Sequence, residues 1–117
     1  MTAEPKTALT PLGIVLCEVG DERQRQDAKW GEQNHPDGTG GLDRRNAADA
    51  QRRWTNMQAA EKTLTWTDIL EEEVAEAVAE TDPLAVRAEL IQVAAVAAAW
   101  VQAIDRRLSA QIVDGAR

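Results

Sequence analysis

Glutamate is concentrated in one short stretch of the chain, "LEEEVAEAVAE", which covers residues 70–80. A helix turns about 100° per residue, so Glu73, Glu76 and Glu80 fall within one narrow sector, beside an apolar stripe. Glu71 and Glu72 lie further from that stripe, where acidic residues near a helix start complement its dipole. The sector of Glu73 therefore borders the side of the helix that faces the core.

Another carboxylate, Glu89, falls on the apolar face of the next predicted helix, in the same sector as Gln92. Burying an unpaired carboxylate is costly, so such a group needs a proton, a basic partner or a metal ion. If the two helices are antiparallel, we expect Glu73, Glu76 and Glu89 to converge across their interface. Carboxylate oxygens bind hard cations such as Mg²⁺ and Mn²⁺. From spacing alone, these residues could form a metal site or could be glutamates exposed to solvent beside an apolar stripe.

The elements that must position these side chains are all expected to be helices. Phe and Tyr are absent, and the β-branched residues do not alternate as they do in strands. Residues 31–41, rich in glycine and holding the only histidine, must form a loop. The periodicity and the capping residues predict four helices, at residues 12–29, at residues 43–60, from a Thr65 or Thr67 cap to about residue 80, and at residues 83–108. The short turn before Pro83 makes the last two antiparallel.

Length and composition predict a single all-α domain over residues 12–108, with a lead-in at 1–11 and a tail at 109–117. The net charge of -7 argues against binding to nucleic acid or to an anionic membrane surface. Cys17 is the only cysteine, which excludes an internal disulfide and suits a reducing compartment. The longest apolar run, residues 93–101, is shorter than a bilayer span, and the first residues do not read as a signal peptide. A cytoplasmic protein is the expectation.

Two acidic motifs together match a known pattern. "EEVAE", residues 72–76, is followed after twelve residues by "ELIQ", residues 89–92. This arrangement resembles the EExxE and ExxD signature of the MazG-like, all-α nucleoside triphosphate pyrophosphohydrolases. The segments "ERQRQDAKWGEQNHPDGTG" and "ELIQVAAVAAAWVQAIDRR" are similar to small MazG-like proteins common in actinobacteria and their phages, and the resemblance covers most of residues 18–107.

The resemblance implies a four-helix bundle-like fold that assembles as a homodimer, sometimes larger, with helices of both subunits completing the core. It implies cleavage of a nucleoside triphosphate between the α and β phosphates, giving the monophosphate and pyrophosphate. Carried over by position, the metal ligands are Glu73, Glu76, Glu89 and Gln92, with Mg²⁺ or Mn²⁺ as the cofactor. Gln92 departs from the family's Asp, which removes one negative charge; Glu80, one turn beyond Glu76, is an alternative source of it.

Phosphoanhydride hydrolysis depends on metal ions and a positioned water rather than on a protein nucleophile. An acidic protein can therefore act on an anionic substrate. We assign Glu73, Glu76 and Glu89 to the metal. One of these, or Glu72 just outside the set, orients the attacking water.

The segment "KWGEQNHP", residues 29–36, is the candidate for substrate recognition. Trp30 offers a stacking surface, Asn34 and His35 offer polar contacts, and Lys29 offers charge. The segment is similar in position to the one that shapes the nucleoside pocket in related pyrophosphohydrolases. The structural alternative is that Trp30 packs and His35 only stabilises the loop.

Other interpretations remain open at this point. The basic residues of the second predicted helix could grip phosphates or simply pair with surface acids. The rival function is a non-catalytic helical module that binds nucleotides or proteins, and the Gln92 departure is its main support. An acidic protein that covers basic DNA-binding surfaces would explain the charge, but it gives no reason for an inward-facing Glu89.

Overall fold

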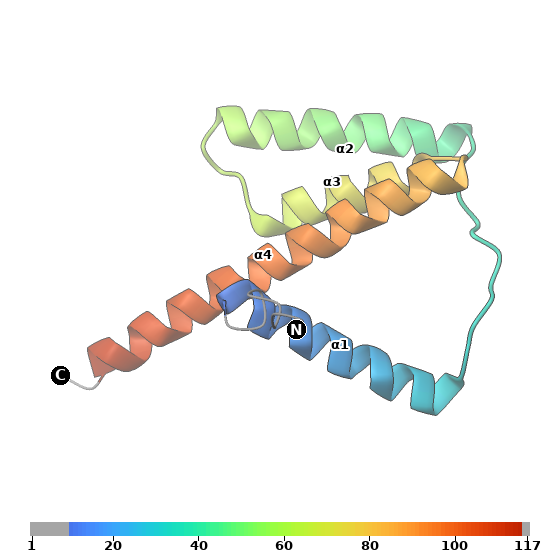
Figure 1. Ribbon diagram of the computed structural model, residues 1–117. Helices are drawn as coiled ribbons and strands as arrows, with labels where there is room; N and C mark the ends of the chain where they lie inside the picture. The colour runs from blue at the N-terminus through green and yellow to red at the C-terminus, as the bar shows by residue number, and fades with distance from the viewer. Residues whose placement is uncertain (1–9, 116–117) are drawn as a thin grey trace, which may run out of the picture. The chain divides into compact units, whose positions relative to one another are not determined.

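The computed structural model describes residues 10–115, and all of the regular structure in that range is helical (Figure 1). This confirms the all-α prediction for the described residues. The helices, in chain order, are α1 Pro11–Trp30, α2 Leu42–Ala60, α3 Trp66–Ala79 and α4 Pro83–Gly115.

The predicted bounds of α1, α2 and α3 agree closely with those observed. At the start of α1, Thr10 Oγ1 accepts a hydrogen bond from the Gly13 amide at 2.9 Å, and Pro11 occupies the first turn. The predicted lead-in therefore ends at Thr10, and residues 1–9 lie outside the described range.

The prediction that the last helix ends at Leu108 is wrong, because α4 continues to Gly115. Residues 109–114, "SAQIVD", contain no proline or glycine, so nothing in them breaks the helix before Gly115. Most of the predicted tail is thus helical, and residues 116–117 lie outside the described range.

The chain divides into two compact units. The first contains the described residues up to His35 and from Ala98 onward, which form α1 and the later part of α4. The second contains residues 36–97, which form α2, α3 and the earlier part of α4. Within the second unit α2 and α3 lie side by side (Figure 1). The single domain over residues 12–108 stays a prediction.

Few apolar side chains are buried. On α1 Val15 is buried, while Leu12, Leu16 and Val19, which share its apolar stripe, are exposed. On α4 Ile91 is 56% exposed. Among the described residues the buried apolar side chains are Val15, Ala48, Ala77, Val86 and Ala98. Among the described residues, large apolar side chains of α1 and α4 are therefore exposed.

One helix in the described range, α4, is long and apolar enough to cross a membrane by length and composition alone. The uninterrupted apolar run at residues 93–101 is shorter than a bilayer span, and an 18-residue stretch of α4 around it includes at least one charged residue. The core helix of a soluble protein passes the same test.

Candidate metal centre

The first turn of α3 is fixed by a network of four hydrogen bonds. Thr65 Oγ1 accepts from the Asp68 amide at 3.2 Å, and Asp68 Oδ2 accepts from the Thr65 amide at 3.1 Å and from the Thr65 hydroxyl at 2.9 Å. From α2, Trp54 Nε1 donates to Asp68 Oδ1 at 2.9 Å. Of the two predicted caps the structure uses Thr65, and the indole nitrogen of Trp54 ties α2 to the capping Asp68. These bonds set the rotation of α3 against α2.

Donated hydrogen bonds favour the ionised form of Asp68. The Trp54 indole has the largest effect, followed by the Thr65 hydroxyl, and together they lower the pKa of the Asp68 carboxyl below its usual value. The side chain is largely buried, with 9% exposed. Asp68 is thus a structural carboxylate.

The turn after α3 reverses the chain and brings α4 back alongside it (Figure 1). Asp82 caps α4: its carbonyl accepts from the Val86 amide at 2.9 Å and its Oδ2 from the Ala85 amide at 3.3 Å. The antiparallel pair predicted from Asp82 and Pro83 therefore forms, and it places Glu89 beside α3.

The loop that leads into α2 is attached to the end of α3. The Gly40 amide donates to the Val78 carbonyl at 2.8 Å, with a φ of +85° at Gly40. A Cβ at this position would lie 2.5 Å from Thr81 Cγ2, so only glycine fits without a shift. This close approach holds the loop against the turn between α3 and α4.

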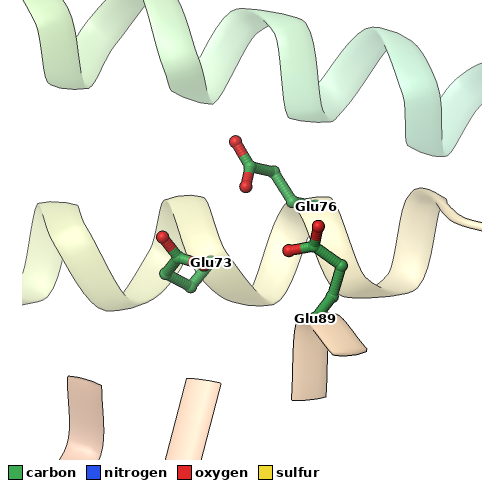
Figure 2. A group of neighbouring side chains, drawn as sticks. All are labelled: Glu73, Glu76 and Glu89. Carbon is green, nitrogen blue, oxygen red and sulfur yellow. The ribbon is translucent and has the colours of Figure 1, made fainter. Parts of the chain in front are cut away.

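Three carboxylates converge between α3 and α4, as predicted. One oxygen from each of Glu73, Glu76 and Glu89 lies within 4.8 Å of the others (Figure 2). In Figure 2 the Glu76 side chain points toward α2, and the Glu89 carboxylate reaches up from α4 beside it. All three residues are half-buried. Two oxygens bound to one hard cation lie at most about 4–5 Å apart, so this spacing fits a shared ion with little rearrangement.

Two atoms of this set are buried without a partner. Glu73 Oε2 and Glu89 Oε2 are shielded from solvent and accept no hydrogen bond from any described residue. Native structures rarely leave a buried carboxylate oxygen in this state, because its lost hydration is not replaced. These two oxygens therefore lack a partner among the described residues, and a bound cation would supply one.

The local electrostatics point the same way. Burial raises the pKa of Glu73, and the neighbouring carboxylates of Glu76, Glu89 and Glu72 raise it further. Burial and Glu76 likewise raise the pKa of Glu72, while Arg52 opposes them. Burial and mutual repulsion therefore disfavour the ionised forms of Glu72 and Glu73.

Arg52 of α2 is the basic residue that touches the set. Its Nη2 lies 3.2 Å from Glu76 Oε1, and its Nη1 lies 3.4 Å from Asp49 Oδ1. The Glu76 side chain is 23% exposed in this pair and that of Arg52 is 50% exposed. Helical spacing within α3 and α4 gave no sign of this partner, because it comes from another helix. The sequence indicated only that α2 carries four arginines, at positions 44, 45, 52 and 53.

An open pocket of about 360 Å³ adjoins the carboxylates. Arg45 and Arg52 of α2 line it together with Glu76, Glu80 and Glu89. Its volume lies within the range of about 300–1,000 Å³ found for small-molecule sites. The pocket thus joins acidic groups suited to a cation with basic groups suited to an anion.

The remaining predicted site residues of the second unit have varied surroundings. Gln92 is exposed on α4, one turn beyond Glu89, and its role as a ligand stays a prediction. Glu80 lines the pocket at the end of α3, and Glu72 is half-buried near Glu76. Their proposed contributions also stay predictions.

The predicted substrate segment belongs to the first unit. Lys29, Trp30, Asn34 and His35 are all exposed there. Lys29 Nζ lies 4.8 Å from the centre of the Trp30 ring, a cation–π contact at the end of α1. An exposed indole is available for stacking, and the role in substrate binding stays a prediction.

Comparison of the chain with protein-family models, with curated proteins and with solved structures finds no match. The fold and the site therefore define a helical protein with a cluster of carboxylates that is a candidate cation site. Any more particular function must be argued from the geometry of that site.

Proposed function

We propose that this chain is a metal-dependent, MazG-like nucleoside triphosphate pyrophosphohydrolase. The observation that carries the proposal is the convergence of Glu73, Glu76 and Glu89, with two buried carboxylate oxygens that have no partner among the described residues. These carboxylates derive from the two motifs that resemble the family signature. A helical protein gains nothing in stability from such a cluster, so a role in binding a cation explains it better.

The donor set suits Mg²⁺ or Mn²⁺, with Glu73, Glu76 and Glu89 as ligands and Gln92 as a neutral fourth. When bound, such an ion neutralises phosphate charge and lowers the pKa of a coordinated water. Glu72 is half-buried beside the set with a raised pKa, which suits it to accept the proton of the attacking water. The water oxygen forms a bond to one phosphorus of the anhydride that joins the α and β phosphates. The bond from that phosphorus to the bridging oxygen breaks, which releases pyrophosphate and the monophosphate.

The nucleoside is assigned to the exposed segment at the end of α1. Trp30 stacks on the base, Asn34 and His35 contact its edge or the sugar, and Lys29 adds positive charge. The support for this assignment is the exposure of these side chains and the resemblance of the segment to the family.

A homodimer in the cytoplasm completes the proposal. Apolar side chains such as Leu16, Val19 and Leu108 are about half exposed on α1 and α4. A second copy of the chain would bury them, in line with a family whose subunits share a core. The net charge of -7 still speaks against nucleic acid and anionic membranes as partners.

The proposal is tested by incubating the protein with each nucleoside triphosphate and Mg²⁺ or Mn²⁺ and measuring pyrophosphate. We expect release of pyrophosphate and the monophosphate, and a loss of roughly a hundredfold or more for Glu73→Gln, since a ligand is lost. Glu71→Gln removes the same charge from an exposed position on the same helix and should keep its activity.

Calorimetry with Mn²⁺ alone separates the alternatives. Cation binding without turnover of any nucleotide would favour the non-catalytic binding module. Absence of both would remove the proposal.

A further inference from the structure

Arg52 stands where the acidic and the basic parts of the pocket meet. It lies two turns after Arg45 on α2, and residues seven apart share one face of a helix. Both arginines line the pocket that also contains Glu76 and Glu89. Only Arg52 reaches the carboxylate set, through Glu76.

The contacts that Arg52 makes are long for its charge. Guanidinium and carboxylate groups that pair well lie about 2.7–2.9 Å apart. Arg52 instead divides its two terminal nitrogens between Asp49 at 3.4 Å and Glu76 at 3.2 Å. Half of its side chain is exposed, and exposed pairs contribute little free energy. The guanidinium is therefore held weakly and can be exchanged.

A cation on the carboxylate set would compete directly with this guanidinium, because both need the oxygens of Glu76 and carry the same sign of charge. Once released, Arg52 would still face the open pocket. Arg45 already lines that pocket and makes no ion pair with any described residue. Two guanidinium groups on one face, next to a cation site, match a chain of linked phosphates, since guanidinium binds phosphate oxygens in pairs.

We propose that Arg52 is an exchangeable counter-ion: it neutralises Glu76 in the metal-free protein, leaves when a divalent cation binds, and then holds the terminal phosphates of the substrate beside Arg45. The inference rests on the proposed function. It adds a substrate contact, and it links the binding of the cation to that of the polyphosphate.

The exchange predicts that one substitution, Arg52→Gln, strengthens the binding of the cation and weakens the binding of linked phosphates. In Arg52→Gln, Mn²⁺ alone should bind about two- to fivefold more tightly, because a competing exposed charge is removed. Imidodiphosphate, a non-hydrolysable linked phosphate, should bind about tenfold or more weakly at saturating Mn²⁺, because a charge-assisted contact is lost. Both affinities are measured by calorimetry on the full chain, with helicity checked by circular dichroism.

Arg53→Gln is the matched control. It makes the same change of charge at the next residue, which is exposed and outside the pocket lining, so it should leave both affinities near those of the unaltered protein. Arg52→Lys keeps the charge but not the paired geometry. It should bind Mn²⁺ about as the unaltered protein does and imidodiphosphate more weakly, and it carries the test if Arg52→Gln does not fold.

The outcomes are distinct. Opposite shifts at position 52 with none at position 53 support the exchange. The exchange is overturned if the affinities for Mn²⁺ and imidodiphosphate change in the same direction in Arg52→Gln, or if Arg53→Gln changes them equally. In either case the proposed function still stands if the unaltered protein releases pyrophosphate. If the unaltered protein binds no Mn²⁺, both proposals fail.

Discussion

Glu73 is the side chain whose state is most coupled to its surroundings. Its Oε2 is buried without a partner, and three neighbouring carboxylates raise its pKa in addition to the effect of burial. A buried acid in this position lowers its free energy by taking up a proton or by sharing a cation. If Glu73 takes up a proton, the stability of the protein falls as the pH rises. If it shares a cation, the stability rises with pH.

We expect the metal-free protein to lose stability as the pH rises. The folded pKa values of Glu72 and Glu73 lie above the ordinary value of 4.5, so their contribution is fully present below pH 4.5 and is lost as the pH passes through the folded values. The lowered pKa of Asp68 acts the other way, since its contribution is lost only as the pH falls below 3.8. Urea unfolding with a chelator from pH 4 to pH 8 measures the slope.

Glu73→Gln should flatten this slope and leave the metal-free protein more stable than the unaltered one at neutral pH. Glu71→Gln is the control for a lost charge at an exposed position. An unaltered slope in Glu73→Gln would show that the proton at this residue is not linked to folding. Saturating Mn²⁺ should reverse the trend in the unaltered protein, because the cation binds the ionised carboxylates.

The convergence of the acidic residues could be predicted, whereas the contact of Arg52 with Glu76 could not. Glu73, Glu76 and Glu89 follow from helical periodicity and a short turn, which are local properties of the sequence. The contact of Arg52 with Glu76 depends on how α2 lies against α3. That relation is set by tertiary contacts, including the bond from Trp54 to Asp68, which no spacing encodes.

At the scale of elements, α3 is the helix that must be placed most accurately, because it carries two of the three converging carboxylates. Its start is fixed by the reciprocal bonds of Thr65 and Asp68. A capping box of this kind satisfies amide groups that would otherwise lack partners at the helix start. The rotation of the helix, and with it the direction of Glu73 and Glu76, follows from that first turn.

Thr65→Ala should destabilise the protein by about 1 kcal/mol, as for other N-cap replacements. Thr67→Ala is a useful comparison, because Thr67 was the alternative cap and is exposed inside the first turn. It should change the free energy of unfolding by less than about 0.5 kcal/mol. Equal effects at the two positions in chemical unfolding would contradict the assigned cap.

Helix bounds could be predicted wherever a capping residue or a glycine marks them. Pro11, Thr65, and Asp82 with Pro83 stand at helix starts as expected, whereas Thr10, which caps α1, had been assigned to the lead-in. The end of α4 was missed, although Ile112 follows Leu108 at helical spacing and nothing breaks the helix before Gly115.

At the scale of the whole molecule, the chain exposes apolar residues that a stable soluble protein normally covers. Ile14 is 57% exposed on α1, and Ile112 is 73% exposed on α4. The sequence could not tell whether these faces are covered by the same chain or by another, because a helix looks equally amphipathic in both cases. The proposed dimer assigns them to a second copy.

Sedimentation should therefore show a dimer at micromolar concentration, and Val101→Glu should weaken it at least about tenfold, because a carboxylate without a partner would enter the interface. Val101 lies in the apolar run of α4 and is 38% exposed. Gln24→Glu, at an exposed position in the polar second half of α1, should leave the dimer intact. A monomer in the unaltered protein would contradict the assignment.

The hydrogen bond from Trp54 to Asp68 also provides an optical probe. Indole emission responds to the group that its nitrogen contacts, and here that group caps the helix that carries Glu73 and Glu76. Replacing Trp30, Trp66 and Trp100 with phenylalanine would leave one fluorophore. Its spectrum would then follow the seating of α3 on α2 in real time, during refolding or while a cation is titrated in.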